Sequence, residues 1–174
     1  ASAQYQQEDL LMHKIENSKQ YKNGKFHNIV PWNATPGAST MWDFFFKNNQ
    51  RTPEDSLPRT MADLSNYNSK DQDQLNSTWL GHSTLLINID GLKIITDPVF
   101  PNRASIFGPT RFNGEIPVDI EQLKDIDVVL ISHNHYDHLN KTSIKHLISR
   151  TKLFIVPLGV GAQLEKWDVP REMI

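Results

Sequence analysis

The sequence predicts an α/β fold in which helices pack on a β-sheet. Apolar, β-branched segments typical of strands begin near residue 77, after a polar segment that occupies residues 1–75. The nearly continuous apolar segment 127–132 is followed by an amphipathic segment at 140–150 and by another apolar segment at 152–160. This order of strand, helix and strand is typical of α/β proteins.

Length and composition limit the alternatives. The chain has 174 residues, enough for one domain with a core or for part of a larger domain. Its formal net charge of −2 provides no overall attraction for nucleic acid, so we expect no nucleic-acid partner. The sequence contains no cysteine, which excludes disulfides and thiolate metal sites. Any metal ion must therefore be held by nitrogen and oxygen ligands.

The first part of the chain is predicted to be an N-terminal extension that precedes the sheet. Residues 1–75 are rich in Asn, Gln, Ser and Lys and are interrupted by prolines, which predicts a partly irregular segment. Within it we expect a helix at about 5–20 and another from Thr40 to Asn48. The chain begins Ala-Ser-Ala, small residues typical of a signal-peptide cleavage site, which favours a processed envelope or membrane-associated protein over a cytoplasmic one. Residues 48–60 and 66–77 have the composition of loops, so we expect loops there.

Apolar segments after residue 77 predict the strands of the sheet. Segments 84–89 and 92–96 are joined by Asp90-Gly91, a strong signal for a two-residue hairpin. Segment 127–132 is apolar nearly throughout, which is typical of a strand covered on both faces. Short helices or turns are expected at 119–126, 140–150 and 161–169.

A cluster of metal-binding residue types directly follows segment 127–132. It contains His133, His135, Asp137 and His138. In extended backbone, alternate side chains share a face, so His133 and His135 can reach one cation. Asp137 and His138 fall in the following turn, where they can support that cation or bind a second one. A bound metal lowers the pKa of water to about 7, which provides hydroxide at neutral pH.

Isolated histidines are more often ordinary surface or core residues than ligands. We assign His13, His27 and His146 to that class, because none lies within a cluster of ligand types.

The segment "SHNHYDHL" resembles the H-x-H-x-D-H motif of the metallo-β-lactamase superfamily. The segments "TWLGHSTLLINIDGLKIITDPVF", "NRAS", "FGPTRF", "DVVLISHNHYDHLN" and "FIVPLGVGAQLEKW" are similar, in the same order, to the branch of N-acylphosphatidylethanolamine-hydrolysing phospholipase D and its bacterial relatives. This similarity runs from about Thr78 to Trp167.

The resemblance implies a dinuclear metal site. His133 and His135 correspond to ligands of the first ion, and Asp137 and His138 to ligands of the second. Asp137 is also the candidate catalytic residue, beside the metal-activated hydroxide. The implied cofactor is Zn²⁺, two ions in the complete protein, with Mn²⁺ or Fe as alternatives.

Further residues correspond to positions around that site. The resemblance places Asp97 behind the ligands, as a hydrogen-bond acceptor for a ligand histidine, and His82 on a neighbouring strand end, in a supporting or a purely structural role. Arg103 and Arg111 follow in a loop, where they can contact a phosphate or form structural ion pairs.

The implied fold is the αββα sandwich, of which this chain corresponds to the N-terminal half: one mixed sheet with flanking helices at 76–174, after the extension at 1–75. One sheet by itself exposes an apolar face, and water contact with that face costs about 25 cal/mol per Å². We therefore expect a partner for the sheet, either the C-terminal half of the same protein or a second chain.

The resemblance leaves three functions open. The chain is expected to belong to a metal-dependent phosphodiesterase that acts on N-acylated glycerophospholipids. The alternatives are a lactonase or other phosphoester hydrolase of the same superfamily, and a non-catalytic half-domain that needs a partner chain.

The aromatic segment 41–46 either makes peripheral contact with a membrane or forms a buried core patch, with Phe44 to Phe46 inside.

Overall fold

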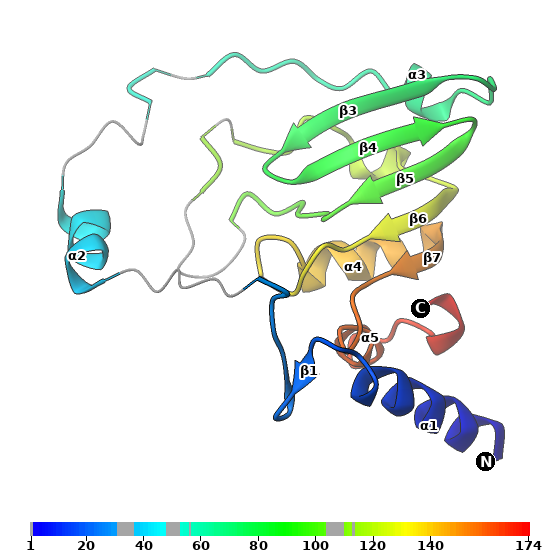
Figure 1. Cartoon of the computed structure of the whole chain (residues 1–174). Coiled ribbons are helices and arrows are strands. Elements are labelled where there is room, and N and C mark those ends of the chain that lie inside the picture. Colours follow the sequence, from blue (N-terminus) through cyan, green and yellow to red (C-terminus); the bar gives the residue numbers. More distant parts are fainter. Residues whose placement is uncertain (1, 31–36, 48–52, 56, 104–109, 113) are drawn as a thin grey trace. The chain divides into compact units, whose positions relative to one another are not determined.

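The computed structural model describes residues 2–30, 37–47, 53–55, 57–103, 110–112 and 114–174 (Figure 1). The chain forms two compact units, residues 1–52 and 53–174, which we treat separately. The predicted division into residues 1–75 and 76–174 stays a prediction. In the described part of the chain, no helix combines the length and the apolar character needed to cross a membrane.

The described residues of the first unit form two helices and a small hairpin. Its elements are α1 (Ser2–Glu16), β1 (Tyr21–Lys22), β2 (Lys25–Phe26) and α2 (Ala38–Phe46). Both expected helices form, although α1 ends at Glu16 and α2 begins at Ala38. The hairpin was not predicted, but its turn residues Asn23 and Gly24 have φ values of 52° and 76°, the conformation that Asn-Gly favours in tight hairpins.

Part of the aromatic segment is on the surface of α2. Trp42 and Phe46 are 64% and 68% exposed, and their ring centroids are 4.3 Å apart. The expectation that Phe46 lies in a buried core patch is therefore wrong, because the side chain packs on its helical neighbour Trp42. The side chains of Phe44 and Phe45 lie outside the described residues.

The second unit is built on one mixed sheet. Its strands are β3 (Leu75–Gly81), β4 (Thr84–Ile89), β5 (Leu92–Thr96), β6 (Ile126–Leu130) and β7 (Thr151–Ile155), and they lie in this order across the sheet. The pairs β3–β4 and β4–β5 are antiparallel, whereas β5–β6 and β6–β7 are parallel. The predicted hairpin is confirmed, since Asp90 and Gly91 join β4 to β5 with φ values of 53° and 82°.

Short helices connect and flank these strands. They are α3 (Ser65–Asn68), η1 (Ile120–Gln122), α4 (Lys141–Leu147), η2 (Ile148–Arg150), α5 (Gly161–Glu165) and η3 (Arg171–Met173). The predicted loop at 66–77 differs from the structure, because α3 and the start of β3 lie within it. The reason is tertiary: Tyr67 is buried, and the Asn88 side chain of β4 donates hydrogen bonds to the carbonyl oxygens of Asn66, Tyr67 and Ser69.

The core lies on one face of the sheet. Leu86, Ile95, Val129 and Phe154 stand opposite one another on four neighbouring strands, and all four are buried. Helix α4 packs against this face, where it contributes apolar residues to the same cluster (Figure 1). The predicted α/β class, one mixed sheet with flanking helices, is confirmed.

The opposite face of the sheet is apolar and uncovered in the described part of the chain. Trp79, Leu130 and Ile155 lie in one cross-strand row and are 67%, 40% and 46% exposed. Leu75, Ile89, Leu92 and Leu153 are exposed on the same face. The apolar pattern of β6 predicted burial on both faces, so the structure supplies the cover for only one of them.

Candidate metal centre

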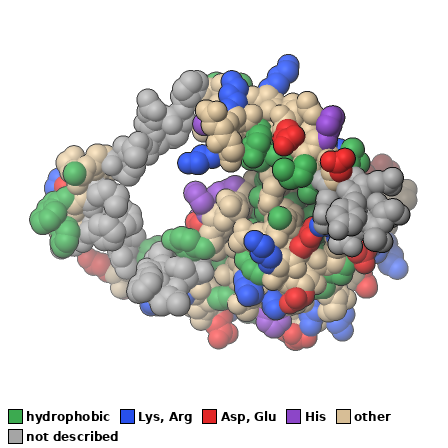
Figure 2. Space-filling view, turned by 90° about the horizontal axis from the view of Figure 1, so that it is seen from below, with side chains coloured by type: hydrophobic (Ala, Val, Ile, Leu, Met, Phe, Trp, Pro, Cys, Tyr) green, Lys and Arg blue, Asp and Glu red, His purple; other side chains and the backbone are tan. Residues whose placement is uncertain are grey.

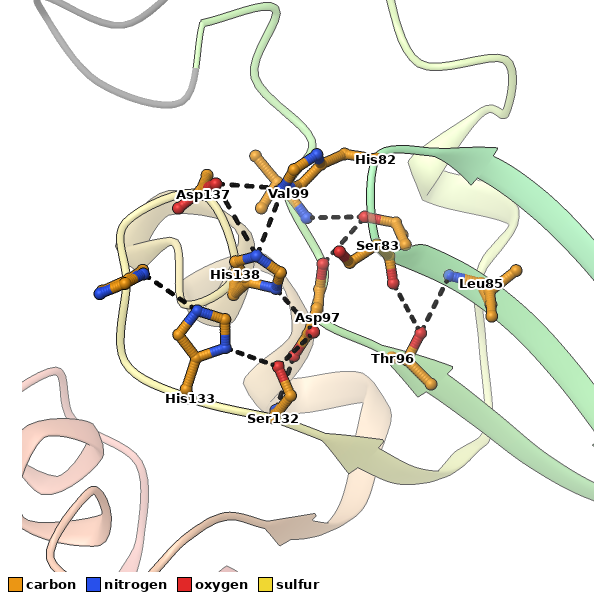
Figure 3. A network of polar contacts seen from close by, with 12 residues as sticks. His82, Ser83, Leu85, Thr96, Asp97, Val99, Ser132, His133, Asp137 and His138 are labelled. Atoms are coloured by element: carbon orange, nitrogen blue, oxygen red, sulfur yellow. Dashed lines mark hydrogen bonds and ion pairs between the residues drawn. The ribbon is translucent and has the colours of Figure 1, made fainter. Parts of the chain in front are cut away.

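Strand direction brings the predicted site residues to one edge of the sheet. Because β4 is antiparallel to both β3 and β5, the carboxyl ends of β3, β5 and β6 all face the same edge. His82 follows β3, Asp97 follows β5, and the segment from Ser132 to His138 follows β6 (Figure 3). Histidine side chains gather on the molecular surface in the space-filling view (Figure 2). The carboxyl edge of a sheet with parallel strands is a common location for binding sites.

His133 and His135 form the first group of ligand atoms. Nε2 of His133 lies 3.1 Å from Nδ1 of His135. Two nitrogens bound to one tetrahedral ion at about 2.0–2.1 Å would be separated by about 3.3 Å, so this spacing fits shared coordination. The turn that follows is closed by backbone hydrogen bonds from the amides of His138 and Leu139 to the carbonyl oxygen of His135.

His82, Asp137 and His138 form the second group. Nε2 of His82 lies 3.0 Å from Oδ2 of Asp137 and 3.3 Å from Nε2 of His138. The remaining distance, from Nε2 of His138 to Oδ2 of Asp137, is 3.7 Å. These three atoms converge closely enough to hold a metal ion. The rings of His133 and His138 are only 4.0 Å apart, so the two groups are neighbours.

Asp97 supports the second group from beneath. Its carboxylate is 5% exposed, and Oδ2 lies 2.9 Å from Nδ1 of His138. A proton on Nδ1 donates to this carboxylate and leaves the Nε2 lone pair free for a metal. Asp97 itself is held by its backbone amide, which donates to Leu130, and by its backbone carbonyl, which accepts from Thr84.

Ser132 links Asp97 to the first group, a role that the sequence analysis missed. Its amide and hydroxyl donate to the two oxygens of Asp97 at 2.7 and 2.6 Å. Its Oγ also lies 2.9 Å from Nδ1 of His133. A proton on that nitrogen would donate to Oγ and direct Nε2 of His133 toward His135. The only sequence signal for this role is a hydroxyl residue directly before the first histidine of the motif.

The local environment favours the metal-binding form of His133. Partial burial, together with the neighbouring imidazoles of His138 and His135, lowers the pKa of His133 below its ordinary value. The neutral ring is therefore the main form at neutral pH, and a neutral imidazole is the form that binds metals.

Two residues at this edge have a strained backbone. His82 and Asp97 have φ values of 49° and 37°, in the left-handed region that costs free energy for residues other than glycine. The bulge at the end of β3 and the positive φ of Gly81, 111°, lead into His82. The indole Nε1 of Trp79 donates to the His82 carbonyl at 2.9 Å and stabilises this turn.

The remaining residues of interest are distributed differently. His146 is exposed on α4, and His13 and His27 are exposed in the first unit. Arg103 is exposed and forms an isolated β-bridge with Thr110. Arg111 is half-buried and lies against Gly81, next to His82.

A cavity of about 550 Å³ opens beside the second group of ligands. His82 and Asp137 line it on the side of the metal centre. Its other walls include the exposed apolar residues Trp79, Phe112 and Tyr136. Sequence analysis did not predict this cavity.

The sequence of this chain is similar to a known protein family and to individual known proteins. Residues 76–167 match the family described as "Beta-lactamase superfamily domain". A Mycobacterium tuberculosis protein named as uncharacterized is 35% identical over 168 residues, which cover 91% of this chain and 44% of that protein. N-acyl-phosphatidylethanolamine-hydrolyzing phospholipase D 1 of Caenorhabditis elegans is 32% identical over 167 residues, which cover 88% of this chain and 44% of that protein.

A third relative and a solved structure are more distant. A metal-dependent hydrolase of Hyperthermus butylicus is 32% identical over 78 residues, which cover 44% of this chain and 29% of that protein. The diiron β-hydroxylase CmlA of Streptomyces venezuelae has a TM-score of 0.43 and 21% identity, with 59% of this chain and 20% of that chain covered, a likeness too distant to bear on function. The chain spans less than half the length of the curated relatives it matches.

Proposed function

Because the chain belongs to the β-lactamase superfamily, we propose that it forms the metal-binding part of a metal-dependent hydrolase that cleaves a phosphodiester in N-acylated glycerophospholipids. The observation that carries the proposal is the convergence of two groups of ligand atoms at one sheet edge: His133 with His135, and His82 with Asp137 and His138. The phosphodiester is supported by similarity to the phospholipase D of Caenorhabditis elegans and by the largely apolar cavity beside the ligands.

The residues present fit a pair of divalent ions. Two imidazoles face one position, and two imidazoles with one carboxylate face a second. When bound, such ions would polarise a phosphoryl oxygen and lower the pKa of a coordinated water. Zn²⁺ suits nitrogen and oxygen ligands, and Mn²⁺ and Fe are the alternatives.

The protein's own residues hold the site in shape. Asp97 and Ser132 orient the rings of His138 and His133, so that the free ring nitrogens face outward from the sheet edge. Asp137, whose carboxylate is partly exposed at the cavity, is the candidate to orient the attacking water and to accept its proton.

The proposal includes a partner for the sheet. The apolar row that runs from Trp79 to Ile155 is larger than isolated exposed residues, and such contiguous apolar surfaces mark interfaces. We propose that a second sheet covers it, from another part of the same protein or from a second chain. Peripheral contact with a membrane would follow from a lipid substrate.

Metal binding tests the first step of the proposal. Addition of Zn²⁺ should raise the melting temperature of the chain, because a ligand that binds only the folded state stabilises it. The double variant H133A/H135A should lose most of this increase, whereas H146A should retain it. An equal increase in all three proteins would contradict the assignment of the ligands.

Hydrolysis tests the substrate class in the assembled protein, with the covering part present. We expect release of phosphatidic acid from N-acylphosphatidylethanolamine and none from H133A/H135A. Ring opening of a lactone without phosphodiester cleavage would favour the lactonase alternative. Metal binding without turnover of either substrate would favour the non-catalytic half-domain.

A further inference from the structure

Arg111 occupies an unusual position in the wall of the cavity. Its guanidinium lies close to Gly81, such that a Cβ added to Gly81 would be 2.6 Å from a terminal nitrogen of Arg111. Gly81 directly precedes His82, so the charged group lies beside the backbone that carries one residue of the second group of ligands. Arg111, His82 and Asp137 line the same cavity.

The guanidinium is held by the backbone. One terminal nitrogen donates to the Leu80 carbonyl at 3.4 Å, and the other donates to the Val99 carbonyl. These carbonyls belong to β3 and to the segment after β5, so the ends of two strands on either side of β4 hold the side chain in place. A charged group fixed in this way loses little conformational entropy when it binds a ligand.

The partners of the Arg111 charge among the described residues are backbone carbonyls. Among residues 2–30, 37–47, 53–55, 57–103, 110–112 and 114–174, no carboxylate forms an ion pair with it. Within the same ranges, its Nε is buried and has no hydrogen-bond partner. A guanidinium has five N–H donors, so two backbone contacts leave several unused. Removing a cation from water without pairing it with an anion is unfavourable. An anionic ligand that bound beside Arg111 would therefore be stabilised there.

Much of the remaining wall of the cavity is suited to hydrocarbon, although Arg59 and Glu115 also line it. Trp79 and Phe112 line it and are 67% and 55% exposed, and Leu57 and Tyr136 add further exposed apolar surface. A ligand with both an anionic group and an apolar chain could contact both kinds of wall at once. Pockets of this type obtain affinity from apolar burial and orientation from a few polar groups.

We infer that Arg111 is the anion-binding residue of this cavity, and that it positions the phosphate of an amphiphilic phosphodiester beside the metal centre while the apolar chain lies against Trp79 and Phe112. This inference rests on the proposed function and deepens it by assigning the substrate-positioning residue. Arginine is suited to the role because its planar fork can donate two parallel hydrogen bonds to phosphate oxygens.

A binding experiment separates this role from a structural one. The dissociation constants of two ligands are measured by calorimetry, with metal removed by EDTA: a short-chain N-acylated phosphatidylethanolamine and the uncharged diacylglycerol with matching chains. In R111Q, affinity for the phosphodiester should fall about 10- to 100-fold, as expected for a lost hydrogen bond to a charged group. Affinity for the diacylglycerol should change less than about two-fold. R150Q, which alters an arginine paired with Glu121, is the matched control and should change neither.

Further variants keep the test decisive. If R111Q does not fold, R111K retains a cation without the planar fork and should show a smaller loss, still confined to the phosphodiester. F112A should weaken both ligands equally, because it changes only the apolar wall. A loss in R111Q or R111K that is equal for the two ligands, or absent for both, would overturn the inference. So would binding of inorganic phosphate as tight as that of the lipid, since the apolar wall would then contribute nothing.

Because these measurements require no metal and no turnover, they remain valid whatever the hydrolysis assay shows. Failure of the phosphodiesterase proposal and failure of the Arg111 assignment are therefore distinguishable.

Discussion

Asp97 connects the two groups of candidate ligands through a single buried carboxylate. It contacts His138 of the second group directly, and it contacts His133 of the first group through Ser132. Its position is fixed on both sides, because its backbone bonds to Leu130 of β6 and to Thr84 of β4. At the residue scale, the orientation of the site therefore depends on a side chain that need not touch a metal.

D97N should lower the affinity for Zn²⁺ about 10- to 100-fold, the usual effect of losing a carboxylate behind a ligand histidine. Asparagine preserves the size of the side chain but removes its charge and one acceptor oxygen. Calorimetric titration with Zn²⁺ measures the change. D168N is the control, because Asp168 pairs with Lys145 on the surface. Equal affinities of D97N and the unmodified chain would show that Asp97 has a purely structural role.

S132A tests the link to His133. Loss of the hydroxyl removes both the 2.6 Å hydrogen bond to Asp97 and the contact with Nδ1 of His133. We expect the Zn²⁺ affinity to fall, by less than in D97N, because the Ser132 amide still donates to Asp97. S149A, at an exposed hydroxyl residue in η2, should leave the titration unchanged. A larger loss in S132A than in D97N would argue that Ser132 and not Asp97 organises the site.

At the scale of elements, the directions of the strands explain the position of the site. Each of the three contributing segments begins where a strand ends, and those ends meet because β4 reverses the chain between β3 and β5. At the opposite end of β4 from the site, Asn88 joins the β4–β5 hairpin to the segment of α3. Asn88 is 2% exposed, and its side chain donates hydrogen bonds to backbone carbonyls of that segment. The side chain of Asn88 also accepts from the amide of Gly91, so it stabilises the hairpin turn as well.

N88A should reduce the free energy of unfolding by about 2–3 kcal/mol, because buried carbonyl groups lose their donor. Urea denaturation followed by circular dichroism measures this change. Asn76 stands directly opposite Asn88 on β3, and among the described residues its side chain hydrogen-bonds only with Gln74. N76A is therefore a matched control and should change the stability by less than about 0.5 kcal/mol. Similar losses in the two variants would contradict the role assigned to Asn88.

At the scale of the whole molecule, the main feature of the second unit is an apolar sheet face that the described residues leave uncovered. Its apolar residues occupy corresponding positions on all five strands, so the surface is continuous across the sheet. A sheet with parallel strands is normally covered on both faces. The proposed covering sheet would remove this surface from water and would complete the surroundings of the metal centre.

Without its cover, the chain should self-associate and enhance the fluorescence of a dye that binds apolar surfaces. The variant L130K/L153K should reduce both effects, because it places two charges within the apolar face, on β6 and β7. Sedimentation velocity and dye titration provide the measurements. S149K/A162K adds the same charge at exposed positions outside the strands and should have little effect. A monomeric chain without dye binding would show that the face is already covered.

Local patterns in the sequence determined the hairpin at Asp90-Gly91, the order of the strands and helices after β3, and the cluster that begins at His133. These features depend on neighbours within a few residues, and local spacing and turn propensities are sufficient to predict them. The apolar residues at consecutive positions of β6 predicted a strand covered on both faces, whereas the expectation of a partner for the sheet came from the family resemblance.

The family resemblance implied that Asp97 and His82 lie near the cluster, but only the tertiary structure decided which atoms of these distant residues meet. His82, Asp97 and Ser132 are separated by long stretches of chain, and they converge because strand pairing brings three carboxyl ends to one edge. The hydrogen bonds between Asn88 and the α3 segment arise in the same way, from contacts between segments that are far apart in sequence, and so does the cavity beside Arg111. Such contacts follow from strand order and direction, which local spacing does not encode.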